Sequence, residues 1–275
     1  MALLSIVVAK SPTDISEFST VEDLIEECKL ENDCEKIIKA LVRAKVNFQF
    51  YDLDSIELVG INLEDANLDN ANLSNADLRI AYLEDVRLKN ANLTDTNLNG
   101  AYLENVYLRN STLTGINLEN TKLYRVNFTD ANLEGAYLVN AELQSEFTNA
   151  NLRYANLSNI KLSYSNLSDA NLEYADLNGA ELELTNIGSS NFHGANLNNV
   201  ILIVPDGLDK SYKAQINAQI KSACNWQQAI YKANWKKGKW IVNEVVNQQY
   251  IEQLKQDKAS DPKEVVDCSR WLDRK

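Results

Sequence analysis

Leucine or phenylalanine recurs at every fifth position from Phe48 to Leu143, and the rhythm resumes at Phe147 and continues to Leu202, with Ile187 as one variant. The residue two places before each of these repeat centres is small or β-branched, most often alanine. Side chains two apart on an extended segment point to the same side, so both project inward and the residue between them points outward. A period of five fits neither a continuous strand nor a helix. It predicts short extended pieces joined by turns, coiled around a line of inward leucines.

A second, longer period runs through the same residues. The pentapeptides INLED at 61, AYLED at 81 and AYLEN at 101 resemble one another more than they resemble their neighbours. Valine also recurs two places before the centre, at Val86, Val106 and Val126. Twenty residues hold four pentapeptides, so this period predicts four faces in each coil. Residues twenty apart are then expected to stack on adjacent coils.

The pattern A(N/D)LXX, repeated four to a coil, resembles the pentapeptide-repeat family. The resemblance covers residues 46–204 and is specific, because 27 of its 32 centres are leucine. The opening NFQFYDLDSIEL and the closing VPDGLD are similar to cyanobacterial members. The resemblance implies an all-β solenoid, namely a right-handed quadrilateral β-helix. Thirty-two faces at four per coil give about eight coils, and about 4.8 Å per coil makes a rod roughly 38 Å long.

The stretch AELQSEFTNANL, residues 141–152, breaks the rhythm, because Phe147 follows Leu143 after four positions instead of five. Counting from Phe48 places the missing residue at a corner between the fourth face of one coil and the first face of the next. We therefore expect Ser145 to turn inward and Phe147 to stack near Phe128. The leucine column should continue through the corner without a domain boundary.

The two ends of a coil stack expose its leucine column, so terminal caps are expected. Thr20 with Asp23, and Asp33 later, provide helix-start signals for two short helices over 20–44. We therefore divide the chain into an N-terminal helical cap (1–45), the solenoid (46–204) and a tryptophan-rich helical extension (205–275). The extension is expected to hold one helix from Tyr212 through Ile220 toward Cys224 and another over about 242–257. The extension is read either as a second cap or as a partner-binding tail, and its last residues, DPKEVVDCSRWLDRK, are expected to be loosely ordered.

Four cysteines at irregular spacing predict buried thiols and not a disulfide framework or a zinc site. Cys28 and Cys34 each fall at helical spacing from apolar residues, which favours the same interpretation. The first nine residues are apolar, but no basic residue precedes them and no clear cleavage site follows. We therefore expect a cytoplasmic protein without a membrane span, with export as the alternative.

Charge is distributed unevenly along the chain. The net charge is -3 over residues 1–45, -13 over 46–204 and +4 over 205–275. Within the solenoid, the face centred on 63, 83 and 103 collects carboxylates that should stack about 5 Å apart on adjacent coils. This acidic ladder is either a solvated face that keeps the rod soluble or a docking surface for a basic protein partner. It comprises Glu64, Asp65, Glu84, Asp85 and Glu104.

Aromatic and basic residues accompany the ladder. Tyr82 and Tyr102 should stack on the acidic face, either to stabilise adjacent coils or as candidate contacts of an interface. Tyr154 and Tyr174 should stack at a corner on the C-terminal side of the four-residue step between Leu143 and Phe147. An adjacent face, centred on 88 and 108, carries the basic residues Arg87, Lys89 and Arg109.

The lysines of the extension lie beside two of its tryptophans. They could touch an anion or a membrane surface, but docking onto the protein's own acidic face is the simpler expectation. They are Lys232, Lys236, Lys237 and Lys239, with Trp235 and Trp240.

The residues predict no catalytic chemistry. His193 follows a repeat centre and so points outward, and no phosphate-binding loop, HExxH, GxSxG or EF-hand pattern is present. We expect no enzyme activity, no cofactor and no metal. The leading hypothesis is a rigid interaction rod whose acidic ladder binds a protein partner.

The resemblance implies two alternative functions. One is a DNA-mimicking inhibitor or protector of DNA gyrase, because the 21 carboxylates of the rod give about one per 1.8 Å, close to duplex DNA. The other is a developmental regulator that acts on a transcription factor in a cyanobacterium. Direct nucleic-acid binding is disfavoured, since a rod of this net charge repels phosphates. A homo-oligomer joined through the C-terminal extension is a further expectation.

Overall fold

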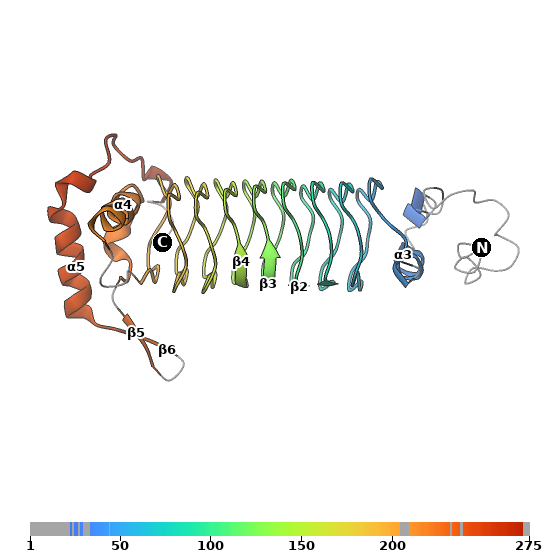
Figure 1. The fold of residues 1–275 in the computed structure, drawn as a ribbon, viewed down its shortest axis with the longest axis horizontal. Helices are drawn as coiled ribbons and strands as arrows, with labels where there is room; N and C mark the ends of the chain where they lie inside the picture. The colour runs from blue at the N-terminus through green and yellow to red at the C-terminus, as the bar shows by residue number, and fades with distance from the viewer. Residues whose placement is uncertain are drawn as a thin grey trace, which may run out of the picture.

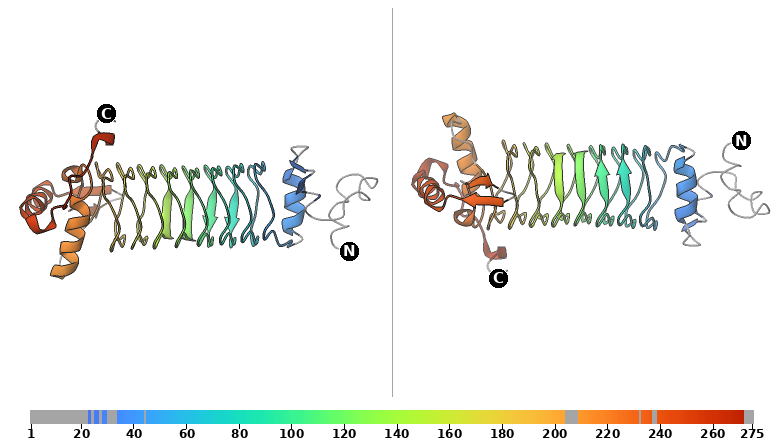
Figure 2. Two further views of the ribbon diagram at one scale, coloured as in Figure 1. Left: turned by 90° about the horizontal axis from the view of Figure 1, so that it is seen from above. Right: turned by 90° about the horizontal axis from the view of Figure 1, so that it is seen from below.

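A computed structural model of the chain describes residues 23, 25–26, 28–29, 34–43, 45–203, 209–231, 233–236 and 239–271. Figures 1 and 2 show a straight rod of stacked coils with helices at both ends. In the described part the named helices are α3 (Cys34–Arg43), α4 (Lys210–Lys221) and α5 (Glu244–Gln256), with 3-10 turns η1 (Trp226–Gln228), η2 (Lys258–Ser260) and η3 (Ser269–Trp271). The strands are β1 (Tyr82–Glu84), β2 (Tyr102–Glu104), β3 (Lys122–Asn127), β4 (Glu142–Glu146), β5 (Ala233–Lys236) and β6 (Lys239–Val242).

The coils are held together by parallel pairing between residues twenty apart. Tyr82 pairs with Tyr102 between β1 and β2, and isolated bridges such as Asn62 to Tyr82 continue the same pattern along the other coils and faces. Each coil donates and accepts backbone hydrogen bonds, as when the Leu63 amide donates to the Tyr82 carbonyl over 2.9 Å. The sheet order is β1-β2-β3-β4, all parallel. The predicted period of twenty is confirmed.

The corners explain why asparagine is abundant. Asn62, one place before a centre, accepts the Glu64 amide on its Oδ1 at 2.8 Å, and the same contact recurs along the rod. Two places after the centre the backbone turns into the left-handed region, with φ of 62° at Asp65 and 62° at Asn70. Asparagine, aspartate and glycine tolerate that conformation best. The polar residues of each repeat therefore build its turn.

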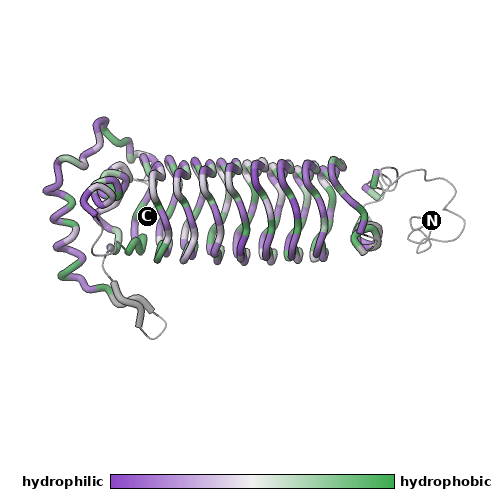
Figure 3. The backbone as a smooth tube through the Cα atoms, viewed as in Figure 1, coloured by the Kyte–Doolittle hydropathy of each residue, from purple (hydrophilic) through white to green (hydrophobic). Residues whose placement is uncertain are grey.

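The core is a continuous column of repeat centres. Every centre from Phe48 to Leu202 is at most 4% exposed, and the inward residues two places earlier pack around it. Where that residue is polar its hydroxyl is paired, as in Thr96, which donates to the Leu73 carbonyl at 2.7 Å. Figure 3 shows polar and apolar residues alternating along each coil.

The dropped residue is absorbed at one corner, as the sequence predicts. The pairing offset changes from twenty to nineteen between β3 and β4, where Asn127 pairs with Glu146. Ser145 is only 7% exposed, and its hydroxyl donates to the Leu123 carbonyl at 3.0 Å. The Phe128 and Phe147 rings stack with centroids 4.7 Å apart. The column runs through the corner without a break.

At the N-terminal end, α3 lies across the first coil (Figure 1). Ile38 and Leu41 of this helix are buried in the same core cluster as the leucine column. Two expectations depend on residues outside the described part, namely the helix-start residues Thr20 and Asp33 and the apolar stretch 1–9. The helix starts and the choice between a cytoplasmic and an exported protein therefore stay predictions.

At the C-terminal end, residues after α4 rejoin the coil stack. The Leu197 amide donates to the Cys224 carbonyl, and the Leu202 amide donates to the Ile230 carbonyl, each over 2.9 Å. Tyr231, fully buried, takes the place that the next leucine of the column would hold. The chain then forms the antiparallel pair β5–β6 and the helix α5 (Figure 2).

Three expectations about the extension and the cysteines are wrong. All four cysteines form disulfides, Cys28 with Cys34 and Cys224 with Cys268. The first bond joins Cys28 to the start of α3, and the second forms because the chain after α5 returns to the rod beside Cys224. Residues 261–271 of the end that was expected to be loose are held by the second disulfide and the buried Trp271, and residues 272–275 lie outside the described residues. β5 and β6, which carry Lys236 and Lys239, lie at the far end of the rod from the acidic ladder, so this pair does not dock there (Figure 1). Lys232 and Lys237 lie outside the described residues.

Candidate functional site

The acidic ladder is in register over three successive coils on the face that carries β1 and β2. Glu84 pairs directly with Glu104 in the parallel sheet, and the Asp65 amide donates to the Glu84 carbonyl one coil on. Glu64, Asp65 and Asp85 are exposed, whereas Glu84 and Glu104 are half-buried. Strand-like spacing places like charges about 5 Å apart. The structure therefore brings all five predicted carboxylates onto one surface.

Two tyrosines cover the half-buried carboxylates. The Tyr82 and Tyr102 rings stack with centroids 5.2 Å apart and 5° between their planes. The Tyr82 hydroxyl donates to Glu84, and the Tyr102 hydroxyl donates to Glu104. The hydrogen bond to Glu84, followed by desolvation and by the nearby negative charge, raises the pKa of Tyr82 to about 12. The bond to Glu104 likewise raises the pKa of Tyr102.

The ladder lacks cations at its N-terminal end. Among the described residues, no basic side chain forms an ion pair with Glu64, Asp65, Glu84 or Asp85. Glu104 does have a cation, since the Arg125 guanidinium donates to it from the next coil. The acidity of this face therefore ends at the coil that carries Arg125, a boundary that the sequence analysis did not identify.

The predicted basic face is largely neutralised within the rod. Arg87 donates to Asp69 over 2.5 Å, and Arg109 is paired with Asp130 at 3.2 Å. Asp69 is 4% exposed and also accepts the Lys89 amide. These carboxylates lie on the preceding or following coil. The positive charge expected at this face is thus smaller than residue counts indicate, whereas only Glu104 of the five ladder carboxylates has a cation partner among the described residues.

A groove extends the acidic surface toward the N-terminal end. It has a volume of about 570 Å³ and lies between the end of α3 and the first coils. Lys39 and Val42 line it from the helix, and Glu64 and Asp65 line it from the ladder. Helix contacts with this face were not predicted, because sequence periodicity gives no angle between α3 and the rod.

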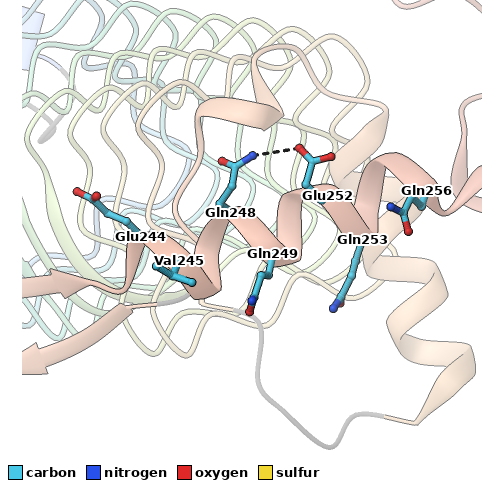
Figure 4. Close-up of a pocket in the computed structure, with 7 residues that line it drawn as sticks. All are labelled: Glu244, Val245, Gln248, Gln249, Glu252, Gln253 and Gln256. Atoms are coloured by element: carbon cyan, nitrogen blue, oxygen red, sulfur yellow. Dashed lines mark hydrogen bonds between the residues drawn. The ribbon is translucent and has the colours of Figure 1, made fainter.

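A larger hollow of about 870 Å³ lies along α5. Figure 4 shows that its seven labelled side chains all come from this one helix. Gln248 donates to Glu252 at 3.0 Å, and Val245 is 68% exposed. A single helix does not enclose a ligand. We therefore place the candidate site at the acidic ladder.

The other predicted groups lie elsewhere on the rod. Tyr154 and Tyr174 stack with centroids 5.6 Å apart, and the half-buried His193 meets Tyr174 edge-on at 5.9 Å. In the described part no cluster of three or more histidine, cysteine or acidic side chains is arranged to hold a metal ion. No helix among the described residues is long and apolar enough to cross a membrane.

An exposed aliphatic side chain at a corner next to the ladder was not predicted from the sequence. Ile80 is 64% exposed and occupies a left-handed corner with φ of 52°, where a β-branched residue is strained. Gly60 and Gly100 flank it on the neighbouring coils, so no side chain covers it there. The isoleucine in a position usually held by asparagine or glycine was the available signal.

Comparisons with known proteins agree with this architecture. A family model described as pentapeptide repeats matches the chain in 8 copies, over residues 47–85, 87–123, 101–140, 121–163 and 165–202. No curated protein matches the chain significantly.

Solved structures of similar proteins include cyanobacterial ones. HetL, a pentapeptide repeat protein involved in heterocyst differentiation regulation from Nostoc sp. strain PCC 7120, is 29% identical over 61% of this chain and 83% of its own, with a TM-score of 0.37. Rfr23 from Cyanothece 51142 is 35% identical over 36% of this chain and 58% of its own, with a TM-score of 0.17. Full-length QnrB1, a plasmid-mediated fluoroquinolone resistance protein, is 18% identical over 59% and 85%, with a TM-score of 0.46.

The family model covers more than half of the chain, and the coils, corners and inward columns follow the repeat that it describes. The chain belongs to the pentapeptide-repeat family.

Proposed function

We propose that this protein is a non-catalytic interaction rod that binds a basic protein partner through the acidic ladder. The observation that carries the proposal is the in-register stack of carboxylates, of which Glu64, Asp65, Glu84 and Asp85 have no described cation partner. Like charges directly opposite one another in a sheet destabilise it. Lysine or arginine side chains of a partner would replace this repulsion with attraction.

The tyrosines supply the apolar part of the same surface. Tyr82 and Tyr102 present a flat stacked pair beside the carboxylates, and Ile80 adds an exposed aliphatic group at the adjoining corner. Binding energy at interfaces is concentrated in aromatic anchors surrounded by weaker contacts. The tyrosines would then contribute affinity, and the carboxylates would contribute association rate and partner choice.

The ends and the interior of the rod support a structural role for the rest of the chain. We infer that α3 closes the first coil and that residues 222–231 with α4 close the last one, because each contributes buried apolar side chains to the column. The void at the α3 end of the column measures only about 10 Å³. That is too small for a substrate.

Capture of partner proteins from a lysate of the source organism tests the proposal. A variant with Glu64, Glu84 and Glu104 changed to lysine should lose the partners that the native rod retains. The matched control carries the same charge change at Glu119, Glu134 and Glu183, which lie outside the ladder. It should keep those partners. Equal loss from both variants would show that net charge, and not this face, drives capture.

The native rod and the ladder variant also distinguish the two alternative functions that the family resemblance implies. If gyrase is the partner, the native rod should inhibit or protect gyrase in a supercoiling assay, and the ladder variant should not. If a transcription factor is the partner, it should appear among the captured proteins and dissociate as salt rises, because exposed charge pairs are screened. If the ladder variant retains the partners of the native rod, the proposal that the acidic ladder binds them is rejected, whichever partner is involved.

A further inference from the structure

The Cys224–Cys268 disulfide fastens a segment that runs back along the rod. Cys224 lies on the returning coil and is 1% exposed, and its bond reaches 44 residues along the chain to Cys268. We call residues 261–271 the strap. Figure 2 shows its end lying beside the last coils. The strap therefore returns to a surface that the solenoid has already formed.

The seat of the strap is the Tyr154–Tyr174 stack. The Trp271 indole nitrogen donates to the Gly194 carbonyl over 2.8 Å, and the ring is 7% exposed. The Arg270 guanidinium lies over the Tyr154 ring, 4.9 Å from its centroid. Gly194 has a φ of +66°, and a Cβ there would lie 2.4 Å from the Tyr174 ring. The seat thus requires glycine at this corner.

The corners under the strap are strained. Tyr154 and Tyr174 have φ of 60° and 57°, in the left-handed region where bulky residues are unfavourable. Equivalent corners on the same face hold Ser55, Asn75 and Asp95. The aromatic rings of Tyr154 and Tyr174 therefore occupy the corners that the strap covers, and Arg270 of the strap contacts the Tyr154 ring.

The strap is attached at its two ends and exposed between them. At its start, the buried Lys221 forms an ion pair with Asp261 and donates to the Asp257 carbonyl over 2.7 Å. Residues 262–265 are exposed, and Val265 is 97% exposed. Conformational entropy opposes the ordering of such a segment. At the far end the disulfide, the indole bond and the Arg270 contact hold it in place.

We propose that the Cys224–Cys268 disulfide is a redox-controlled lock on the strap, and that its reduction by a dithiol releases the strap and uncovers the Tyr154–Tyr174 stack. A thiolate of the dithiol attacks the Cys268 sulfur and forms a mixed disulfide, and Cys224 leaves as a thiolate that takes up a proton. The second thiol of the dithiol then displaces Cys268. Two electrons and two protons pass to the protein, and the dithiol becomes a disulfide.

Exposure makes this bond the more accessible of the two. Cys268 is half-buried, whereas Cys28 and Cys34 are 0% and 4% exposed. A dithiol should therefore reduce Cys224–Cys268 before Cys28–Cys34. Disulfides persist in oxidising compartments and are reduced in the cytosol. The strap should be seated in the first environment and released in the second.

The Trp271 indole reports directly on the strap. In the oxidised full-length protein its N–H resonance, assigned by its loss in Trp271→Phe, should exchange slowly with solvent. After reduction the exchange should accelerate by at least about tenfold, because the bond to Gly194 opens with the strap. Cys268→Ser should show the fast exchange without any reductant. Cys28→Ser/Cys34→Ser should keep the slow exchange until a dithiol is added.

Two results would overturn the proposal. Slow indole exchange in the fully reduced protein would show that the strap stays seated without the bond. Alkylation and mass spectrometry that find Cys28–Cys34 reduced first would contradict the selectivity. Far-ultraviolet circular dichroism of Cys268→Ser separates release from unfolding, since the solenoid signal should be unchanged when only the strap leaves.

Discussion

Truncation of Phe147 is a direct test of how the dropped residue is accommodated. Phe147 is 1% exposed and stacks on Phe128 at 4.7 Å, at the corner where the pairing offset changes. Phe147→Ala removes the ring from a core that is already closed on all sides. Such substitutions lower the free energy of unfolding by about 3–5 kcal/mol, which combines lost burial with the cavity left behind.

Urea unfolding followed by circular dichroism measures this loss. With a slope of about 2–3 kcal/mol per molar urea, the midpoint should fall by about 1–2.5 M. Phe147→Leu retains most of the apolar volume and should lose about 1.5 kcal/mol or less. Tyr137→Ala, at a position 49% exposed, is the surface control. A loss below about 1 kcal/mol for Phe147→Ala would show that the slip leaves the corner loosely packed, contrary to the structure.

Two further predictions concern the aromatic stacks. Because the pKa of Tyr82 is raised from 10.0 to about 12, its contribution to stability is fully present below pH 10 and is lost as the pH rises toward 12. In a tyrosinate absorbance titration Glu84→Gln should move this ionisation to lower pH, and an unchanged titration would contradict the assigned cause. Gly194→Ala should destabilise the protein more than Gly135→Ala, since both strain the backbone but only at 194 does the Cβ meet Tyr174. Equal losses in thermal unfolding would contradict that contact.

The repeat itself was predictable from the sequence because its physical cause is local. The inward leucine, the small residue before it and the turn-forming asparagine recur within each pentapeptide, so the period of five and the stacking at twenty follow from single residues. Even the slip at Ser145 could be placed, since counting faces locates the corner. The stacking of Tyr82 on Tyr102 follows in the same way.

What could not be predicted depends on contacts between elements that share no repeat. The Cys224–Cys268 pair forms because residues 261–271 return to the rod beside the coil that carries Cys224, and irregular spacing gives no sign of this return. The pairing of Arg87 with Asp69 likewise depends on side-chain reach between adjacent coils. Residue counts therefore overestimated the positive charge of the basic face, whereas Glu64, Asp65 and Asp85 of the acidic ladder are exposed, as the outward repeat position predicts.

Carboxylate footprinting of the rod with its captured partner bound tests the central claim most directly. A carbodiimide with an amine modifies exposed carboxylates, and mass spectrometry reports the extent at each residue. We predict that the partner protects Glu64, Asp65 and Asp85, while Glu119 and Glu134 on other faces are modified as in the free rod. Protection of those two glutamates with no change at the ladder would contradict the account.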